Sequence, residues 1–140
     1  MPRADKLSPG AVKLLKERQV ALIATVMKDG SPQLTPVWVD ADEDGSHVII
    51  NTRDENLKFK NISRDPRVAI SVVDSENMWR LVTVHGTVVE RTKDGAIEHI
   101  NRMAKKYRGQ DQYPFRSPDE AQKRTIVRIK PHHVVERGTD

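Results

Sequence analysis

The chain has 140 residues, with 24 Lys and Arg against 20 Asp and Glu and a formal net charge of +4. This length favours a single domain with its own core. Cysteine is absent, which excludes disulfides, thiolate metal sites and a cysteine nucleophile. No apolar run approaches the roughly 20 residues of a membrane span, and the start of the chain leads into no apolar signal core. We therefore expect a soluble cytoplasmic protein with no membrane partner.

The basic balance favours an anionic partner. Charged residues of both signs make up 31% of the chain, however, and no run of five or six like charges occurs. Because the positive charge is dispersed and aromatic residues are only 4%, a small anionic ligand is favoured over nucleic acid. A nucleic-acid-binding barrel stays as an alternative, supported by the pI of about 9.5.

The first elements follow from local signals. Ser8 is a good N-cap and Pro9 suits a first helical turn, so a short helix is expected there. The apolar run of residues 20–27 predicts a strand buried on both faces. A tight glycine turn returns the chain into a second strand at residues 33–39. Pro36 cannot donate to a strand ladder, so it predicts an edge or a bulge.

The rest of the chain alternates strands with short helices. Further strands are expected at residues 47–52, 68–73, 81–90 and 125–129. Pro131 is expected to break the last of them and leave residues 132–136 as an edge piece. Helices are expected at residues 57–62, capped by Thr52 or Asp54, at residues 94–107, and as a turn at residues 119–123. Six or seven meandering strands predict a small closed or half-closed barrel in one domain, residues 1–140, with flexible ends at 1–7 and 137–140.

The sequence motifs of several common catalytic sites are absent. There is no Gly-x-Ser-x-Gly elbow, no Gly-x-x-x-x-Gly-Lys phosphate loop and no Gly-x-Gly-x-x-Gly turn. The five histidines are scattered, and the adjacent His132 and His133 would point to opposite faces of a strand. Solvated histidines are therefore favoured over a metal site, and no metal is expected.

The densest polar feature lies between Asn51 and Arg67. A helix start there offers free backbone N–H groups beside Lys58, and such helix ends bind anions. Lys58 and Asn61 are three residues apart, so they share one side of the helix and suit one phosphate. The alternative is that Lys58 and Lys60 are solvent-facing charges on a surface helix.

Tryptophan residues offer a second, weaker signal. Trp79 and Arg80 stand together at a strand start, where an aromatic ring and a cation could cover a flat ligand and hold an acidic tail. The alternative for Trp79 is a core or oligomer contact. Trp38, two residues after Pro36, is expected to be structural.

Three segments follow one another along the chain: a hairpin at residues 24–33, a helix with its following strand at residues 58–69, and a strand with a glycine and a threonine at residues 84–88. In this order, they resemble the first hairpin, the phosphate helix and the glycine-threonine strand of the FMN-binding split barrel of the pyridoxamine 5′-phosphate oxidase-like proteins, in the branch that uses the deazaflavin coenzyme F420. The resemblance spans Ser8 to Val135. It implies a mainly β fold with flanking helices, a six-stranded antiparallel split barrel, and a homodimer with cofactor sites at its interface.

The resemblance also implies a set of cofactor-binding residues. Lys58 matches the lysine that holds the cofactor phosphate, and Asn61 matches its partner on the helix. The other positions are the strand end beside the phosphate and ribityl chain (Asn51 and Thr52), the helix start (Asn56 and Leu57), the strand facing the ring (Gln33, Thr35 and Pro36), and two residues reaching in from the other subunit (Trp79 and Arg80).

The function implied is hydride transfer from reduced F420 to a small conjugated substrate. Asn56 favours F420 over FMN, because members that bind FMN tightly usually add arginines near the phosphate helix. True pyridoxamine phosphate oxidases carry further C-terminal arginine and histidine residues, so their substrate is not expected. The alternatives are an FMN-dependent oxidoreductase or oxidase and a binding protein without turnover. No acid or base is assigned, since Tyr107, Tyr113 and His85 are each more consistent with structural roles.

Overall fold

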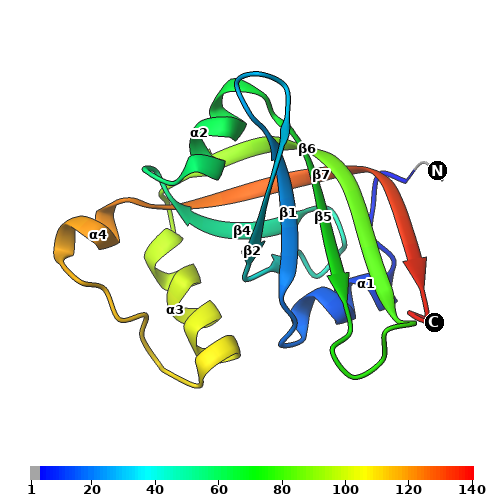
Figure 1. The fold of residues 1–140 in the computed structure, drawn as a ribbon. Helices are drawn as coiled ribbons and strands as arrows, with labels where there is room; N and C mark the ends of the chain where they lie inside the picture. The colour runs from blue at the N-terminus through cyan, green and yellow to red at the C-terminus, as the bar shows by residue number, and fades with distance from the viewer. Residues whose placement is uncertain (1–3) are drawn as a thin grey trace.

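The computed structural model describes residues 4–140 as a seven-stranded antiparallel sheet with four helices around it (Figure 1). The strands are β1 (Ala21–Val26), β2 (Pro32–Val37), β3 (Asp40–Ala41), β4 (Val48–Arg53), β5 (Arg67–Val73), β6 (Leu81–Thr92) and β7 (Arg124–Arg137). The helices are α1 (Pro9–Lys16), α2 (Leu57–Arg64), α3 (Ala96–Arg108) and α4 (Pro118–Gln122).

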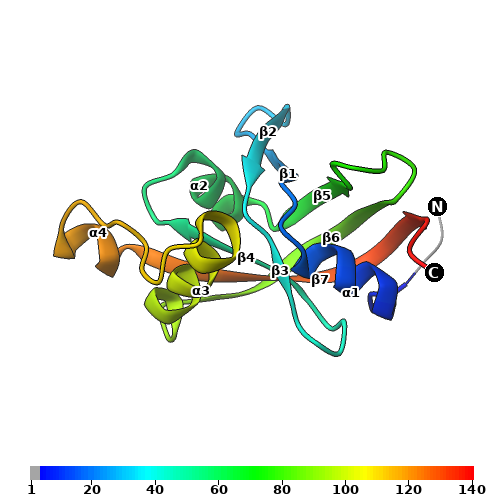
Figure 2. The same cartoon turned by 90° about the horizontal axis from the view of Figure 1, so that it is seen from below.

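The sheet curls into a half-barrel because its two edges are close in the sequence. The strand order is β2-β1-β5-β6-β7-β4-β3, so β2 and β3 lie at opposite ends of the sheet. Only Trp38 and Val39 separate these strands, and so short a link spans at most roughly 11 Å. The ends must therefore approach each other, and Figure 2 shows the chain running from β2 directly into β3. The prediction of six strands is short by one, the two-residue β3.

β1 is buried on one face only. Ala21, Ile23 and Thr25 are buried inside the curl, whereas Leu22 is 43% exposed on the other side. The prediction of a strand buried on both faces is wrong for this chain, since the half-barrel covers only its concave side. The prediction for Pro36 is confirmed: β2 is an edge strand that pairs with β1 alone.

β7 is continuous, so the predicted break at Pro131 is wrong. His85 pairs with His133 but Gly86 pairs with Pro131, which leaves one extra residue on β7 and makes a bulge. A bulge tolerates a residue without an N–H donor. The predicted edge piece at residues 132–136 is therefore the second half of β7, which lies beside β6.

One helix cap was predicted correctly and one was not. The Ser8 side chain accepts a hydrogen bond from the Ala11 N–H and caps α1. α2 is capped by neither Thr52 nor Asp54: its N-cap residue is Asn56, which makes no side-chain capping bond. Thr52 instead accepts a hydrogen bond from the Asn56 amide, so both side chains are engaged away from the helix start.

The core fills the concave side of the sheet and the space under α1. Its largest fully buried side chains include Leu14, Leu15, Ile23, Ile50, Ile70 and Ile129. The flexibility expected for residues 1–7 and 137–140 stays a prediction. Residues 1–3 lie outside the described residues, and in the rest of these two ends Leu7 and Thr139 are buried. Among the described helices, none has the length and apolar character needed to cross a membrane.

Candidate cofactor site

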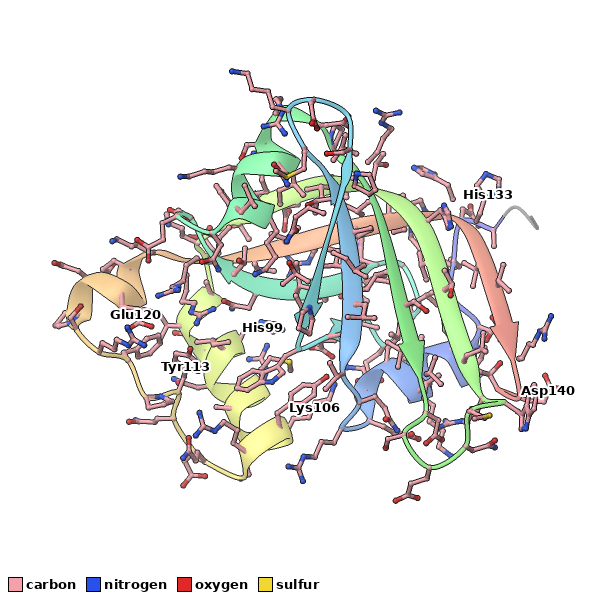
Figure 3. All side chains as sticks on the ribbon, viewed as in Figure 1. His99, Lys106, Tyr113, Glu120, His133 and Asp140 are labelled. Atoms are coloured by element: carbon pink, nitrogen blue, oxygen red, sulfur yellow. The ribbon has the colours of Figure 1, made fainter. Side chains whose placement is uncertain are left out.

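A cavity of about 650 Å³ opens where the edge strand β2, the ends of β4 and β7, the start of α2 and the α3–α4 segment meet. Figure 3 shows two of its lining residues, Tyr113 after α3 and Glu120 on α4. The lining residues are Val20, Pro36, Val37, Trp38, Asn51, Arg53, Asn56, Lys58, Ile100, Arg108, Tyr113, Pro114, Arg116, Glu120 and Arg124.

Several residues implied by the resemblance come together here. Pro36, Asn51, Asn56 and Lys58 line the cavity from β2, β4 and the start of α2. Thr52 is fully buried and accepts a hydrogen bond from Asn56 Nδ2 at 3.0 Å. Thr52 therefore orients Asn56 rather than reaching the cavity itself.

Other implied residues lie outside the cavity lining. Asn61 is buried against β1, where its amide donates to Thr25 Oγ1 at 3.0 Å and its oxygen accepts from Arg64. Gln33 and Thr35 hydrogen-bond each other along β2, and Leu57 is half-exposed. Cofactor contacts by these residues stay predictions.

Trp79 and Arg80 also lie apart from the cavity lining, at the turn between β5 and β6. Trp79 is 70% exposed. The Arg80 guanidinium is bound within its own chain, at 2.6 Å from Glu17 and 3.1 Å from Asp74. Their predicted role from a second subunit stays a prediction.

The cavity is strongly cationic. Arg53, Lys58, Arg108, Arg116 and Arg124 line it, and Glu120 is the one carboxylate among the described lining residues. Burial, and secondarily Arg124 and Arg53, hold the pKa of Lys58 below its usual range. An anion bound beside Lys58 would relieve this repulsion, which makes the site suited to a phosphate.

Antiparallel pairing of β4 with β7 creates this charge cluster. Arg53 and Arg124 are direct cross-strand partners, 71 residues apart in the sequence. From Asn56 we inferred that the phosphate helix has no arginines near it, and the structure shows that this inference is wrong. The arginines come from β4 and β7 instead, so this argument no longer separates F420 from FMN. Local sequence patterns give no signal for such a pair.

Arg124 is the most constrained of these cations. It is only 7% exposed, and its carbon Cζ lies 4.5 Å from the centroid of the Tyr113 ring. Burial lowers its pKa, and its Nε has no hydrogen-bond partner among the described residues. A buried donor without an acceptor is costly. A phosphate oxygen would satisfy it.

The start of α2 adds uncapped backbone donors. Asn56 makes no side-chain capping bond, so the first N–H groups of α2 find no side-chain acceptor there. These donors stand beside Lys58 in the same helix turn. Together with Arg124 they fit the phosphate of a flavin or deazaflavin cofactor.

An aromatic wall bounds the other side of the cavity. The Trp38 ring stacks on Tyr107 with centroids 5.1 Å apart and meets Tyr113 edge-on at 6.1 Å. Trp38 thus has the structural role predicted from sequence and also lines the cavity. Pro36 and Ile100 extend this apolar surface, which suits a planar ring.

Of the side chains considered as proton donors, only Tyr113 lines the cavity. The Tyr107 hydroxyl donates to the Gln19 carbonyl at 2.5 Å and accepts from the Val39 N–H, so it is a structural group. His85 is exposed on β6. Among the described lining residues, Tyr113 therefore carries the one available hydroxyl group.

Comparison with known proteins agrees with the fold. The chain is similar to an F420 reductase of known structure, with 26% identity, a TM-score of 0.78, and coverage of 92% of this chain and 98% of that one. A conserved hypothetical protein from Mycobacterium tuberculosis has 24% identity and a TM-score of 0.70, covering 99% and 90%. A candidate pyridoxamine 5′-phosphate oxidase from Lactobacillus delbrueckii has 23% identity and a TM-score of 0.66, covering 96% and 99%.

The last two likenesses show the fold alone. The family model described as pyridoxamine 5′-phosphate oxidase matches residues 7–138, almost the whole chain. The chain therefore belongs to the pyridoxamine 5′-phosphate oxidase family, whose split barrel its half-barrel resembles.

Proposed function

We propose that the chain is a coenzyme F420-binding oxidoreductase that passes a hydride from the reduced deazaflavin to a small conjugated substrate. The observation that carries this proposal is the cationic cavity, with five basic side chains against one carboxylate. A cofactor with a phosphate and an acidic tail carries several negative charges. The likeness to an F420 reductase at 26% identity supports the same cofactor.

Four of the five basic side chains form two groups that suit such a cofactor. Lys58, Arg124 and the start of α2 would hold the phosphate. Arg108 and Arg116, at the end of α3 and in the segment before α4, would hold the acidic tail. FMN has one phosphate and would need the first group only. The second group is therefore the feature that favours F420.

Bound there, the deazaflavin ring would supply the hydride chemistry. The chain would contribute orientation and exclusion of water. Trp38 and Pro36 offer a flat apolar wall for the ring, and the cations at α2 fix the opposite end of the cofactor. By holding the cofactor at both ends, these residues would fix its orientation toward the substrate.

We further propose that a second copy of the chain completes the cavity. Leu22 pairs with Pro36 on β2 and with Ser71 on β5. Side chains two residues apart on a strand point to the same face, so Leu34 on β2 and Val73 on β5 share the outward face of Leu22. Leu22, Leu34 and Val73 are all exposed. This apolar face continues into the cavity lining at Pro36, so a homodimer formed there would cover the cavity.

FMN is the second candidate cofactor. The cross-strand pair of Arg53 and Arg124 beside α2 favours it, because two guanidinium groups there suit a tightly held single phosphate. Under this alternative the chain is an FMN-dependent oxidoreductase of the same fold.

Replacement of Lys58 tests the proposed phosphate position. Lys58→Ala should weaken F420 binding by about ten- to hundredfold, as expected for loss of a charged hydrogen bond. Lys60→Ala is the matched control, since Lys60 is an exposed lysine on the same helix. Binding is followed by the fluorescence of F420 titrated with protein. Equal affinities of the two variants would place the phosphate elsewhere.

A further inference from the structure

Three polar side chains from three elements form a row that begins at the cavity wall and has the buried His99 at its centre. Asn51 of β4 lies with its Nδ2 3.2 Å from Nδ1 of His99 on α3. The other ring nitrogen of His99, Nε2, lies 3.3 Å from Asp40 Oδ2 on β3. His99 is only 2% exposed, and Figure 3 shows its side chain between α3 and the sheet. Of the three, Asn51 lines the cavity.

The orientation of the Asn51 amide is fixed by the backbone. Its Nδ2 donates to the Ala96 carbonyl at 2.8 Å. The reversed amide would place two oxygens against each other, so nitrogen must face Ala96 and His99. Asn51 Oδ1 then points the other way. This oxygen is buried and has no hydrogen-bond partner among the described residues.

The same contacts fix the proton on His99. An amide nitrogen cannot accept a hydrogen bond, so His99 Nδ1 must accept from Asn51 and carries no proton. The neutral ring then has its proton on Nε2, where it faces Asp40. Asp40 is an acceptor, because hydrogen bonds from His99, Ala41 and Lys16 outweigh its burial and hold its pKa well below the usual range.

We propose that His99, held by Asp40, is a positioning residue that locks the Asn51 carboxamide so that Oδ1 faces away from the ring and accepts a hydrogen bond from a donor group of the bound ligand. For the identity of the ligand this rests on the proposed function: the donor is a hydroxyl group of the polyol chain beside the cofactor phosphate. An anionic oxygen cannot donate, so Asn51 and Lys58 recognise different parts of the ligand.

The first test reads the His99 ring in the protein without ligand. Long-range ¹H–¹⁵N spectra of the full chain distinguish the two neutral tautomers and the charged ring, and loss of the signal in His99→Phe assigns it. We expect a proton on Nε2 and none on Nδ1 at neutral pH. A proton on Nδ1 would overturn the proposal, whatever the ligand.

The second test measures binding of F420, FMN and inorganic phosphate to variants. His99→Phe keeps a flat ring but has no acceptor for Asn51, and should weaken F420 and FMN by about tenfold. His99→Asn places an oxygen near the position of Nδ1 and should restore most of that loss. Binding of inorganic phosphate, followed by chemical shifts of the α2 amides, should be unchanged in both variants.

The outcomes separate the two proposals. Equal loss of cofactor affinity in His99→Phe and His99→Asn would show that the ring acts by packing alone and would refute the positioning role. If the unmodified protein binds neither F420 nor FMN, the proposed function and the polyol assignment fall together. In that case, the tautomer measurement still tests whether His99 fixes the orientation of the Asn51 carboxamide.

Discussion

Two lysines of this chain, Lys58 and Lys106, have different surroundings and different roles. Lys58 faces other cations in the cavity, whereas Lys106 donates to the Leu15 carbonyl at 2.8 Å and to the Val39 carbonyl at 2.6 Å. Lys106 thereby joins the end of α1 to the link between β2 and β3. Burial is the main cause that lowers its pKa to about 8. Its role is structural.

This low pKa predicts a pH dependence of stability. The folded chain releases the Lys106 proton near pH 8, whereas the unfolded chain keeps it to about 10.5. Between these values the unfolded state binds more protons, so the Lys106 contribution to stability rises with pH. The free energy of unfolding relative to Lys106→Met should rise by on the order of 1–3 kcal/mol from pH 8 to pH 10. Denaturant unfolding at fixed pH values measures it, and a flat or falling difference would contradict it.

Single-residue signals reveal some parts of the site and miss others. Lys58 and the start of α2 could be predicted, because a helix start beside a lysine is a local pattern. Arg124 could not, since its place beside Arg53 depends on a strand pairing across 71 residues. The packing of Asn61 against β1 could not be predicted, because helical spacing shows which side chains share a face but not which neighbour that face meets.

At the scale of elements, the pairing of β6 with β7 depends on Gly86. A Cβ at this position would lie 2.3 Å from the Lys130 carbonyl oxygen and 3.0 Å from Ile129 Cγ2. The close approach lies beside the bulge that accommodates Pro131. Glycine is therefore required there by space.

Gly86→Ala should destabilise the fold by about 1–3 kcal/mol, because the added methyl group meets backbone that can move only by disturbing the bulge. The control is His85→Ala on the exposed face of the same strand, expected to stay within about 0.5 kcal/mol. Thermal or urea unfolding compares the two. Equal stabilities would show that the bulge adapts freely.

Most elements could be predicted because their signals are local. Ser8 caps α1 and Pro36 marks an edge through groups within a few residues. The break predicted at Pro131 was wrong because a proline interrupts a strand only where its missing N–H would be needed. In the folded sheet, the bulge opposite Gly86 removes that need. Asn56 was missed as the N-cap residue of α2, because Thr52 was expected to cap the helix. In the fold, the Thr52 hydroxyl accepts a hydrogen bond from the Asn56 side chain instead.

For the whole molecule, the exposed apolar face of β1, β2 and β5 predicts a dimer. Leu34 is 61% exposed, and Leu34→Glu would place a charge on this face, at the edge strand β2. We expect the unmodified chain to sediment as a dimer and this variant as a monomer. Val89→Glu, at another exposed apolar strand position, is the control and should stay dimeric. A monomeric unmodified chain would refute the shared cavity.

The order of the hairpin, the phosphate helix and the following strands was enough to predict the family and the barrel. The curl of the sheet also follows from sequence, once β2 and β3 are known to be opposite edges. The cavity could not be predicted in this way. Its walls come from segments that meet only after the sheet has closed, including Trp38 and Tyr113.

In the proposed function, the two groups of cations select a deazaflavin with an acidic tail. Fluorescence titrations of the purified protein with F420 and with FMN, under the same salt conditions, test it most directly. We expect tighter binding of F420, with a preference that shrinks when Arg108 and Arg116 are both replaced by alanine. Tighter binding of FMN, or a preference for F420 that survives this double replacement, would contradict it.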